Sequence, residues 1–259
     1  MRIAIGIHYN GGSYHGWQVQ SDMLTVQGVV EKALAKVAAH PVRLYCAGRT
    51  DTGVHALDQV AHFDTVSQRE MRSWVFGTNS YLPRDVAITW AKPVPDEFHA
   101  RFSAIDRAYR YLIYNHPVRP ATLASLVTWY YQALNVDKMR SACQDLIGKH
   151  DFSAYRAVGC QARSPVREIF TFDITQQNHL IQLDVRANGF LHHMVRNMVG
   201  VLMAIGSEKA PVTWAKEVLL ARDRGLGGVT APPYGLYLRR VTYDPCFRLP
   251  LPASQIVSL

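Results

Sequence analysis

The chain has 259 residues, and its 28 Lys and Arg against 20 Asp and Glu leave a formal net charge of +8. Hydrophobic residues make up 48% of it and charged residues 19%, a balance that excludes disordered and fibrous proteins. At about 150 residues per domain, the length fits one large domain or two small ones. Because 21 of the 28 cations are arginines, which make bidentate contacts with phosphate, we expect a polyanionic partner.

The sequence contains no segment suited to a membrane or to secretion. The longest apolar run near a helical pattern, Met198 to Ile205, is far shorter than the roughly 20 residues of a membrane span. Residues Met1 to Ile7 alternate like a strand and lack the features of a secretory signal, so we expect a cytoplasmic protein. The cysteines form no C-x-x-C pair and no zinc-site spacing, so we expect reduced thiols and no metal: Cys46, Cys143, Cys160 and Cys246.

The first part of the chain alternates strand and helix periods. Apolar residues at helical spacing, among them Val26, Val30 and Leu34, predict a helix that Pro41 ends. In chain order the predicted elements are strand 2–10, helix 25–39, strands 42–46 and 59–64, helix 68–76 and strand 86–91. Their order is β-α-β-β-α-β.

The rest of the chain repeats this order with unrelated residues. Its predicted elements are strand 109–114, helix 136–147, strands 170–175 and 180–185, helices 190–205 and 214–221, and strand 236–243. The pattern predicts an α+β protein built from two tandem split β-α-β (ferredoxin-like) halves. We place the boundary near residue 105, which gives a half from 1 to 105 with the candidate catalytic loop and a half from 106 to 259.

The segment Gly48 to Ala56, between two predicted strands, is the first candidate site. Asp51 stands there between hydroxyl residues and close to Arg49, and an ionised carboxylate can act as nucleophile, base or metal ligand. A purely structural Asx-turn is the competing interpretation. Asp51-Thr52-Gly53 also resembles the motif of aspartic proteases, but the chain contains no second copy, which leaves only a dimeric protease of that kind.

Aromatic residues alternate with arginines in two neighbouring segments, Phe98 to Phe102 and Arg107 to Tyr111. On a strand, Tyr109 and Tyr111 share one face and Arg110 takes the other. Such a face can stack an RNA base, although half-buried core tyrosines are the commoner outcome.

A third candidate segment runs from Asn188 to Asn197. On a helix, Arg196 lies about 140° from Leu191 and therefore off the apolar stripe. It could pair with a loop carboxylate such as Asp51, or it could simply be solvated. Adjacent side chains on a helix point about 100° apart, so we do not expect His192 and His193 to share a metal.

Taken together, these motifs resemble the tRNA pseudouridine synthase A family nearly from end to end. The matching segments are 14–18, 26–27, 48–56, 98–102, 109–111, 152–163, 190–197 and 235–237. One departure is Thr52, where the family usually has a small residue such as Ala. Thr52 adds bulk beside Asp51 without removing a functional group.

The resemblance implies a role for five residues. Asp51 is the nucleophile, Tyr109 lies against the target uracil, and Arg196 pairs with Asp51. Arg49 helps to extrude the base, and Leu236 packs beneath it. The resemblance further implies isomerisation of uridine to pseudouridine at positions 38, 39 and 40 of the tRNA anticodon stem-loop. It also implies a homodimer, no cofactor, no DNA partner, and a pseudouridine synthase fold whose two halves meet at a central catalytic cleft.

The route of the reaction stays open at this stage. Asp51 could attack the sugar C1′, add to C6 of uracil, or act as a base in a glycal route. A catalytically inactive RNA-binding protein of the same fold is the main competing class. Apolar walls such as Leu236 would keep water away from a reactive intermediate.

Overall fold

The computed structural model describes residues 1–250, and these pack into two compact units. Among the described residues, the first unit comprises Met1–Ile105 and residues 237–250, and the second comprises Asp106–Leu236. One junction between the two units follows residue 105. The chain returns to the first unit at Tyr237, however, so the second unit does not contain the last strand that the sequence assigns to it.

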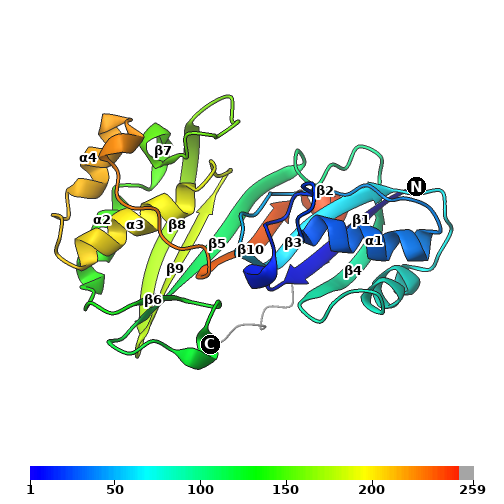
Figure 1. Cartoon of the computed structure of the whole chain (residues 1–259). Helices are drawn as coiled ribbons and strands as arrows, with labels where there is room; N and C mark the ends of the chain where they lie inside the picture. Colours follow the sequence, from blue (N-terminus) through cyan, green and yellow to red (C-terminus); the bar gives the residue numbers. More distant parts are fainter. Residues whose placement is uncertain (251–259) are drawn as a thin grey trace. The chain divides into compact units, whose positions relative to one another are not determined.

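The first unit is built from five strands and one long helix (Figure 1). Their bounds are β1 Arg2–Tyr9, α1 Val26–Ala38, β2 Tyr45–Cys46, β3 His55–Asp64, β4 Val86–Val94 and β10 Leu236–Tyr243. Short helical turns occur at Gly11–Ser13, Ser73–Gly77 and Pro245–Phe247.

The sheet of the first unit has the strand order β4-β1-β3-β10, and β2 pairs with β3. β1 runs antiparallel to both of its neighbours, with Ile3 opposite Phe63 and Ile5 opposite Ala61. β10 runs parallel to β3, with Tyr237 opposite His55, and the two rings stack at 4.6 Å between centroids. The sheet is therefore mixed, and this pairing is why the last strand belongs to the first unit.

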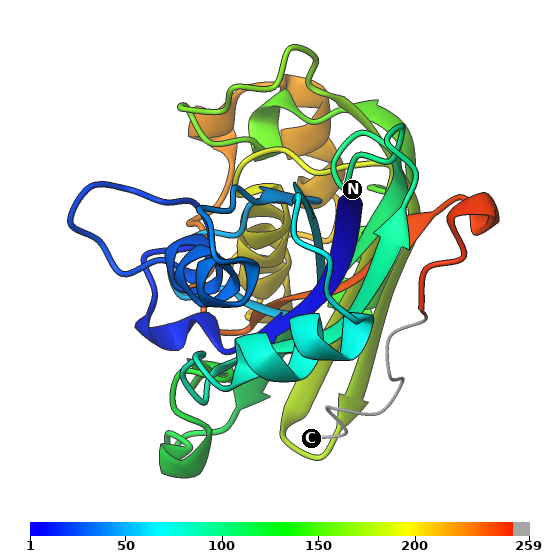
Figure 2. The ribbon, with the colours of Figure 1, turned by 90° about the vertical axis from the view of Figure 1, so that its right-hand side faces the viewer.

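Helix α1 covers one face of this sheet, on the same side as the turn Ser73–Gly77 (Figure 2). Thr25 begins the helix, and its hydroxyl accepts a hydrogen bond from the Gly28 N–H. The buried residues Val26, Val30 and Leu34 are four apart and form one apolar stripe. The helix ends where Ala39 takes a left-handed conformation, two residues before Pro41.

The second unit contains five strands and three helices. Their bounds are β5 Ala104–Asn115, β6 Thr128–Tyr130, α2 Val136–Gln144, β7 Gly148–Asp151, β8 Val166–Gln177, β9 Leu180–Ala187, α3 Met194–Gly206 and α4 Trp214–Ala221. Short 3₁₀ turns occur at Ala121–Leu123, Ser153–Tyr155 and Arg224–Leu226. The strand order is β5-β9-β8-β7, with β6 added parallel to β5.

The core of the second unit lies between this sheet and its helices, where α2 packs on β8 and α3 packs on α2 and α4 (Figure 1). Leu183 and Val185 of β9 are opposite Tyr111 and Tyr109 of β5, and these four side chains are buried. No helix among residues 1–250 is long and apolar enough to span a bilayer.

Most predicted elements are confirmed, but strands β6 and β7 were not predicted from the sequence. The helix predicted at 68–76 is helical over 71–79, and most other bounds shift by one to five residues. α2 ends at Gln144 rather than 147, because Gly148, at φ +103°, opens the short strand β7. α3 begins at Met194 rather than 190, because the chain before it is tied elsewhere: the His192 carbonyl accepts the Ala157 N–H at 2.9 Å. α4 and β10 have the predicted bounds.

Candidate active site

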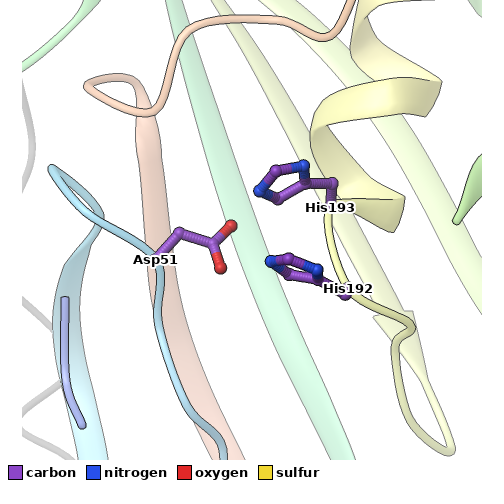
Figure 3. Close-up of side chains that lie close together, drawn as sticks. All are labelled: Asp51, His192 and His193. Atoms are coloured by element: carbon purple, nitrogen blue, oxygen red, sulfur yellow. The ribbon is translucent and has the colours of Figure 1, made fainter. Parts of the chain in front are cut away.

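Asp51 lies in the loop that leads from β2 to β3 in the first unit, and Figure 3 draws its side chain. Asp51 is half-buried, whereas Arg49 and Thr52 on the same loop are exposed. A carboxylate that is partly shielded and carried by a strand-anchored loop is suited to chemistry on a bound ligand. The exposure of Thr52 also means that its extra bulk is accommodated without repacking the core.

Main-chain hydrogen bonds hold this loop against the segment that follows β1. The Trp17 N–H donates to the Thr50 carbonyl at 3.0 Å, and the Gly53 N–H donates to the Tyr14 carbonyl at 3.3 Å. The buried Thr50 hydroxyl shares a hydrogen bond with the Tyr9 hydroxyl at 2.7 Å. The residues on both sides of Asp51 are thus held from one neighbouring segment.

Two glycines make this close approach possible. Gly16 has φ +80°, and a Cβ there would lie 2.7 Å from the Thr50 carbonyl oxygen. A Cβ at Gly11 would overlap the Val54 carbonyl, while the Gly11 N–H donates to Nδ1 of His55 at 3.0 Å. Sequence reasoning did not assign these glycines a role. Their position in the loop between the first strand and the first helix was the one feature of the sequence that could have indicated this role.

Two other ionisable groups of the first unit are not suited to nucleophilic attack. Burial raises the pKa of the Cys46 thiol to about 12, against the opposing effect of Arg49, so this thiol stays protonated at neutral pH. Burial likewise raises the pKa of Asp58 to about 6. The Asp58 carboxylate accepts the Val241 N–H at 3.4 Å, so it joins β3 to β10.

Tyr109 stands on β5 in the second unit, with 9% of its surface exposed. Its ring meets the Phe190 ring edge to face at a centroid distance of 5.0 Å, which fixes the orientation of the tyrosine. Tyr111 on the same face is fully buried, and its hydroxyl bonds Thr128 and the Pro232 carbonyl. Tyr111 is therefore a core residue, and Tyr109 is the one of the pair that remains partly accessible.

Arg196 lies in the first turn of α3 and is half-buried. Its Nε donates to the Ala231 carbonyl at 2.8 Å, and its own carbonyl accepts the Ala231 N–H at 3.1 Å. The next residue, Asn197, is buried and donates to the Tyr155 carbonyl at 2.8 Å while accepting the Thr230 hydroxyl at 2.7 Å. This network locks the loop before β10 onto the helix and fixes the base of the Arg196 side chain.

Leu236 is 5% exposed and stands at the start of β10. Its N–H donates to the Pro233 carbonyl at 2.9 Å. The preceding residue, Gly235, leaves no room for a Cβ because the Leu112 carbonyl and Thr128 press against it. The position of Leu236 is therefore set by the main chain on which it stands.

The two neighbouring histidines, drawn in Figure 3, precede α3 rather than lying on it. The expectation that their rings point about 100° apart is wrong, because His193 takes a left-handed conformation with φ 59°. The ring centroids of His192 and His193 lie 4.0 Å apart. Two imidazoles offer two nitrogen ligands, fewer than the four of a closed zinc site.

The predicted site residues thus fall into two groups. Arg49 and Asp51 share one loop of the first unit. Tyr109, Arg196 and Leu236 belong to the second unit, where Tyr109 packs on Phe190 and Arg196 is tied to the loop that leads to Leu236.

Comparison with known proteins identifies the family. A model of the tRNA pseudouridine synthase family matches residues 5–103 and 142–244. A Coxiella burnetii protein named tRNA pseudouridine synthase A is 56% identical over 249 residues, or 96% of this chain and 95% of that protein.

Relatives in two other bacteria carry the same name. The one from Pseudomonas aeruginosa is 56% identical, covering 96% of this chain and 88% of that protein. The one from Legionella pneumophila (strain Lens) is 51% identical, covering 96% and 95%. With its α+β content and mixed sheet, this chain belongs to the tRNA pseudouridine synthases, isomerases that convert uridine to pseudouridine in tRNA.

Proposed function

We propose that this chain isomerises uridine to pseudouridine at positions 38, 39 and 40 of the tRNA anticodon stem-loop. The observation that carries the proposal is the Asp51 loop: a half-buried carboxylate in the motif Gly48 to Ala56, held on both sides by main-chain hydrogen bonds. The resemblance of the motifs to the anticodon stem-loop enzymes supports the choice of positions.

The reaction needs no oxidant and no net water. The bond from N1 of uracil to C1′ of ribose breaks, the ring turns, and a new bond forms between C5 and C1′. The proton on C5 is lost and N1 gains one, so atoms and electrons balance. We propose Asp51 as the group that starts this sequence, through C1′, through C6 or as the base of a glycal route.

The remaining site residues act on the base and on the charge of Asp51. Tyr109 stacks on the target uracil and accepts the C5 proton, and Leu236 forms an apolar wall beneath the ring. Arg49 helps to extrude the nucleotide, which offsets an unstacking cost of a few kcal/mol. Arg196 pairs with the Asp51 carboxylate. The 9% of the Tyr109 surface that stays exposed and the fixed base of Arg196 support these roles.

We further propose two split β-α-β halves that share a catalytic cleft and a cytoplasmic homodimer that grips one tRNA across both subunits. The element orders β1-α1-β2-β3-β4 and β5-β6-α2-β7-β8-β9-α3, in which β6 and β7 are short additions, support the first point. The net charge of +8 and the excess of arginine support a large RNA-binding surface.

The test is tritium release from unmodified tRNA that carries tritium at C5 of uracil, with a metal chelator present. We expect release at stem-loop uridines 38 to 40 and none from a tRNA with cytidines at these positions. Binding of tRNA without release would indicate an inactive RNA-binding protein. Cleavage of peptides without release would indicate a dimeric aspartic protease.

A further inference from the structure

We propose that Arg107 and Arg167 of the second unit bind one phosphate of the RNA backbone, next to the base platform of Tyr109. The inference rests on the proposed function, because it names a contact for the same substrate. Both arginines border a single turn, Asn188–Gly189, which follows β9.

Arg107 approaches this turn from β5. It stands two residues before Tyr109 and therefore on the same face of the strand. Its partner position in β9 is Ala187, and its Nη1 donates to the Asn188 carbonyl at 3.4 Å. The half-buried residue Arg107 thus stands at the end of a face that is otherwise apolar and aromatic.

Arg167 approaches the same turn from β8, on the other side of β9. Its Nε lies 3.5 Å from the place where a Cβ on Gly189 would be, so the missing side chain makes room for it. Its Nη1 donates to the main-chain carbonyls of Ser164 and Val166, at 3.0 and 2.6 Å. These carbonyls hold the side chain in place without neutralising its charge.

The other arginines of this sheet are paired differently. Arg110 makes a bidentate contact with Asp184 at 2.9 and 3.0 Å, and Arg186 contacts Asp106 at 3.1 Å. Arg167 is held by carbonyls instead, and burial lowers its pKa, against an opposing effect of Cys160 and with a smaller lowering by the charge of Arg107. Two cations held near each other are costly, and an anion bound between them relieves that repulsion.

The location of the pair favours a phosphate of the bound nucleotide strand. Gly189 is followed directly by Phe190, whose ring packs on Tyr109 at 5.0 Å. A base on Tyr109 therefore has its own sugar and phosphate near this turn. Two planar guanidinium forks match the oxygens of a phosphodiester, and on the proposed function the ligand of this face is RNA.

The first experiment measures tRNA affinity against salt concentration for Arg107→Gln and Arg167→Gln. The double variant should reduce the log–log slope by about 0.7 to 0.9, the value for one lost phosphate contact, and each single variant should reduce it by part of that amount. Arg140→Gln is the matched control, because Arg140 already pairs with Asp137 at 2.6 Å, and its slope should not change. Arg167→Lys keeps the charge and should keep most of the slope. Circular dichroism establishes that each variant is folded.

The second experiment places single neutral methylphosphonate linkages in a synthetic anticodon stem-loop, one phosphate at a time around the target uridine. At one linkage the substitution should lower the affinity of the wild type, whereas the affinity of Arg167→Gln should not change. Two results would overturn the inference: unchanged salt slopes in both variants, or no linkage that distinguishes wild type from Arg167→Gln. The two arginines would then bind a carboxylate or stabilise the fold instead of binding a phosphate.

The phosphate site and the proposed isomerase activity are tested independently. Tritium release by the wild type is scored in the same samples. Release with unchanged variant slopes would refute the phosphate site and leave the isomerase standing. Absence of release would refute the proposed function, while the slopes and the methylphosphonate scan would still decide whether the two arginines hold a phosphate.

Discussion

The Asp51 loop and the Tyr109–Arg196 region are positioned by different means. In the first unit, main-chain contacts position the Asp51 loop: the N–H groups of Trp17 and Gly53 donate hydrogen bonds, and two glycines allow a close approach. In the second unit, side chains position the site residues: the Asn197 amide makes buried hydrogen bonds, and the Phe190 ring packs on Tyr109. The position of the Asp51 loop therefore depends mainly on main-chain contacts, whereas the second region depends on the chemistry of its buried groups.

Asp51→Asn should have the largest effect on activity. It also tests whether the Asp51 side chain is catalytic or structural, and therefore whether the two regions differ as described. We expect pseudouridine formation to fall to the detection limit while folding and tRNA binding persist, because the loop is held by main-chain contacts. Tritium release and a binding titration on the same preparation measure this. Asparagine is as good a turn former as aspartate, so an active Asp51→Asn enzyme would establish the Asx-turn interpretation instead.

Gly16→Ala tests the main-chain clamp itself. A Cβ at φ +80° and 2.7 Å from the Thr50 carbonyl should lower the free energy of unfolding by about 3 kcal/mol and shift the Asp51 loop. Urea unfolding measures the loss. Gly159→Ala is the matched control, because nothing lies within 4 Å of a Cβ there. Equal stability of the two variants would mean that the clamp is not needed.

Tyr109→Phe separates stacking from proton transfer in the second unit. The ring and its contact with Phe190 remain, so tRNA affinity should survive, while turnover should fall about 10²-fold if the hydroxyl is the general base. Single-turnover kinetics at saturating enzyme measure the step. Normal turnover would reduce Tyr109 to a stacking platform.

Asn197→Asp tests the buried polar network that holds the start of α3. The carboxylate still accepts from the Thr230 hydroxyl and from the Arg224 guanidinium, but it faces the Tyr155 carbonyl without a hydrogen to donate. We expect a loss of about 2 kcal/mol in the free energy of unfolding, with KM and kcat affected less than by Tyr109→Phe. A variant as stable as the wild type would remove the contrast between the two regions.

The smallest effect concerns pH and the first unit alone. Burial, followed by the neighbouring His99 and Arg2, lowers the pKa of His62 to about 4, and its Nδ1 accepts the Ala100 N–H. The unfolded state therefore binds more protons than the folded state between about pH 4 and 6.5. Stability from this residue is present above pH 6.5 and is lost as the pH falls through that window.

Asp58 acts in the opposite direction, because its pKa is raised to about 6 and its contribution decreases as the pH rises from about 4 to 6. The measurement is therefore the difference between wild type and His62→Gln in unfolding free energy at several pH values. The destabilisation caused by the substitution should be greater at pH 7 than at pH 4. A difference that does not vary with pH would show that His62 titrates normally.

Local patterns were sufficient for most elements of this protein. The predicted bounds of α4 and β10 agree with the structure, and α1 differs by one residue at each end, because periodic burial and end signals such as Thr25 and Pro41 are written in neighbouring residues. The Asp51 loop could also be singled out, since a carboxylate among glycines and hydroxyls between two strands is a local feature.

Contacts between distant segments decided the rest. The apolar stripe of α3 extends back to Leu191, yet the helix begins at Met194 because the His192 carbonyl bonds residue 157. The return of β10 to β3, the fit of Gly16 against the Asp51 loop and the meeting of Arg107 with Arg167 at one turn all join residues far apart in the chain. Periodicity reports which face of an element is buried, but it carries no information about which partner buries it, and that choice belongs to the tertiary structure.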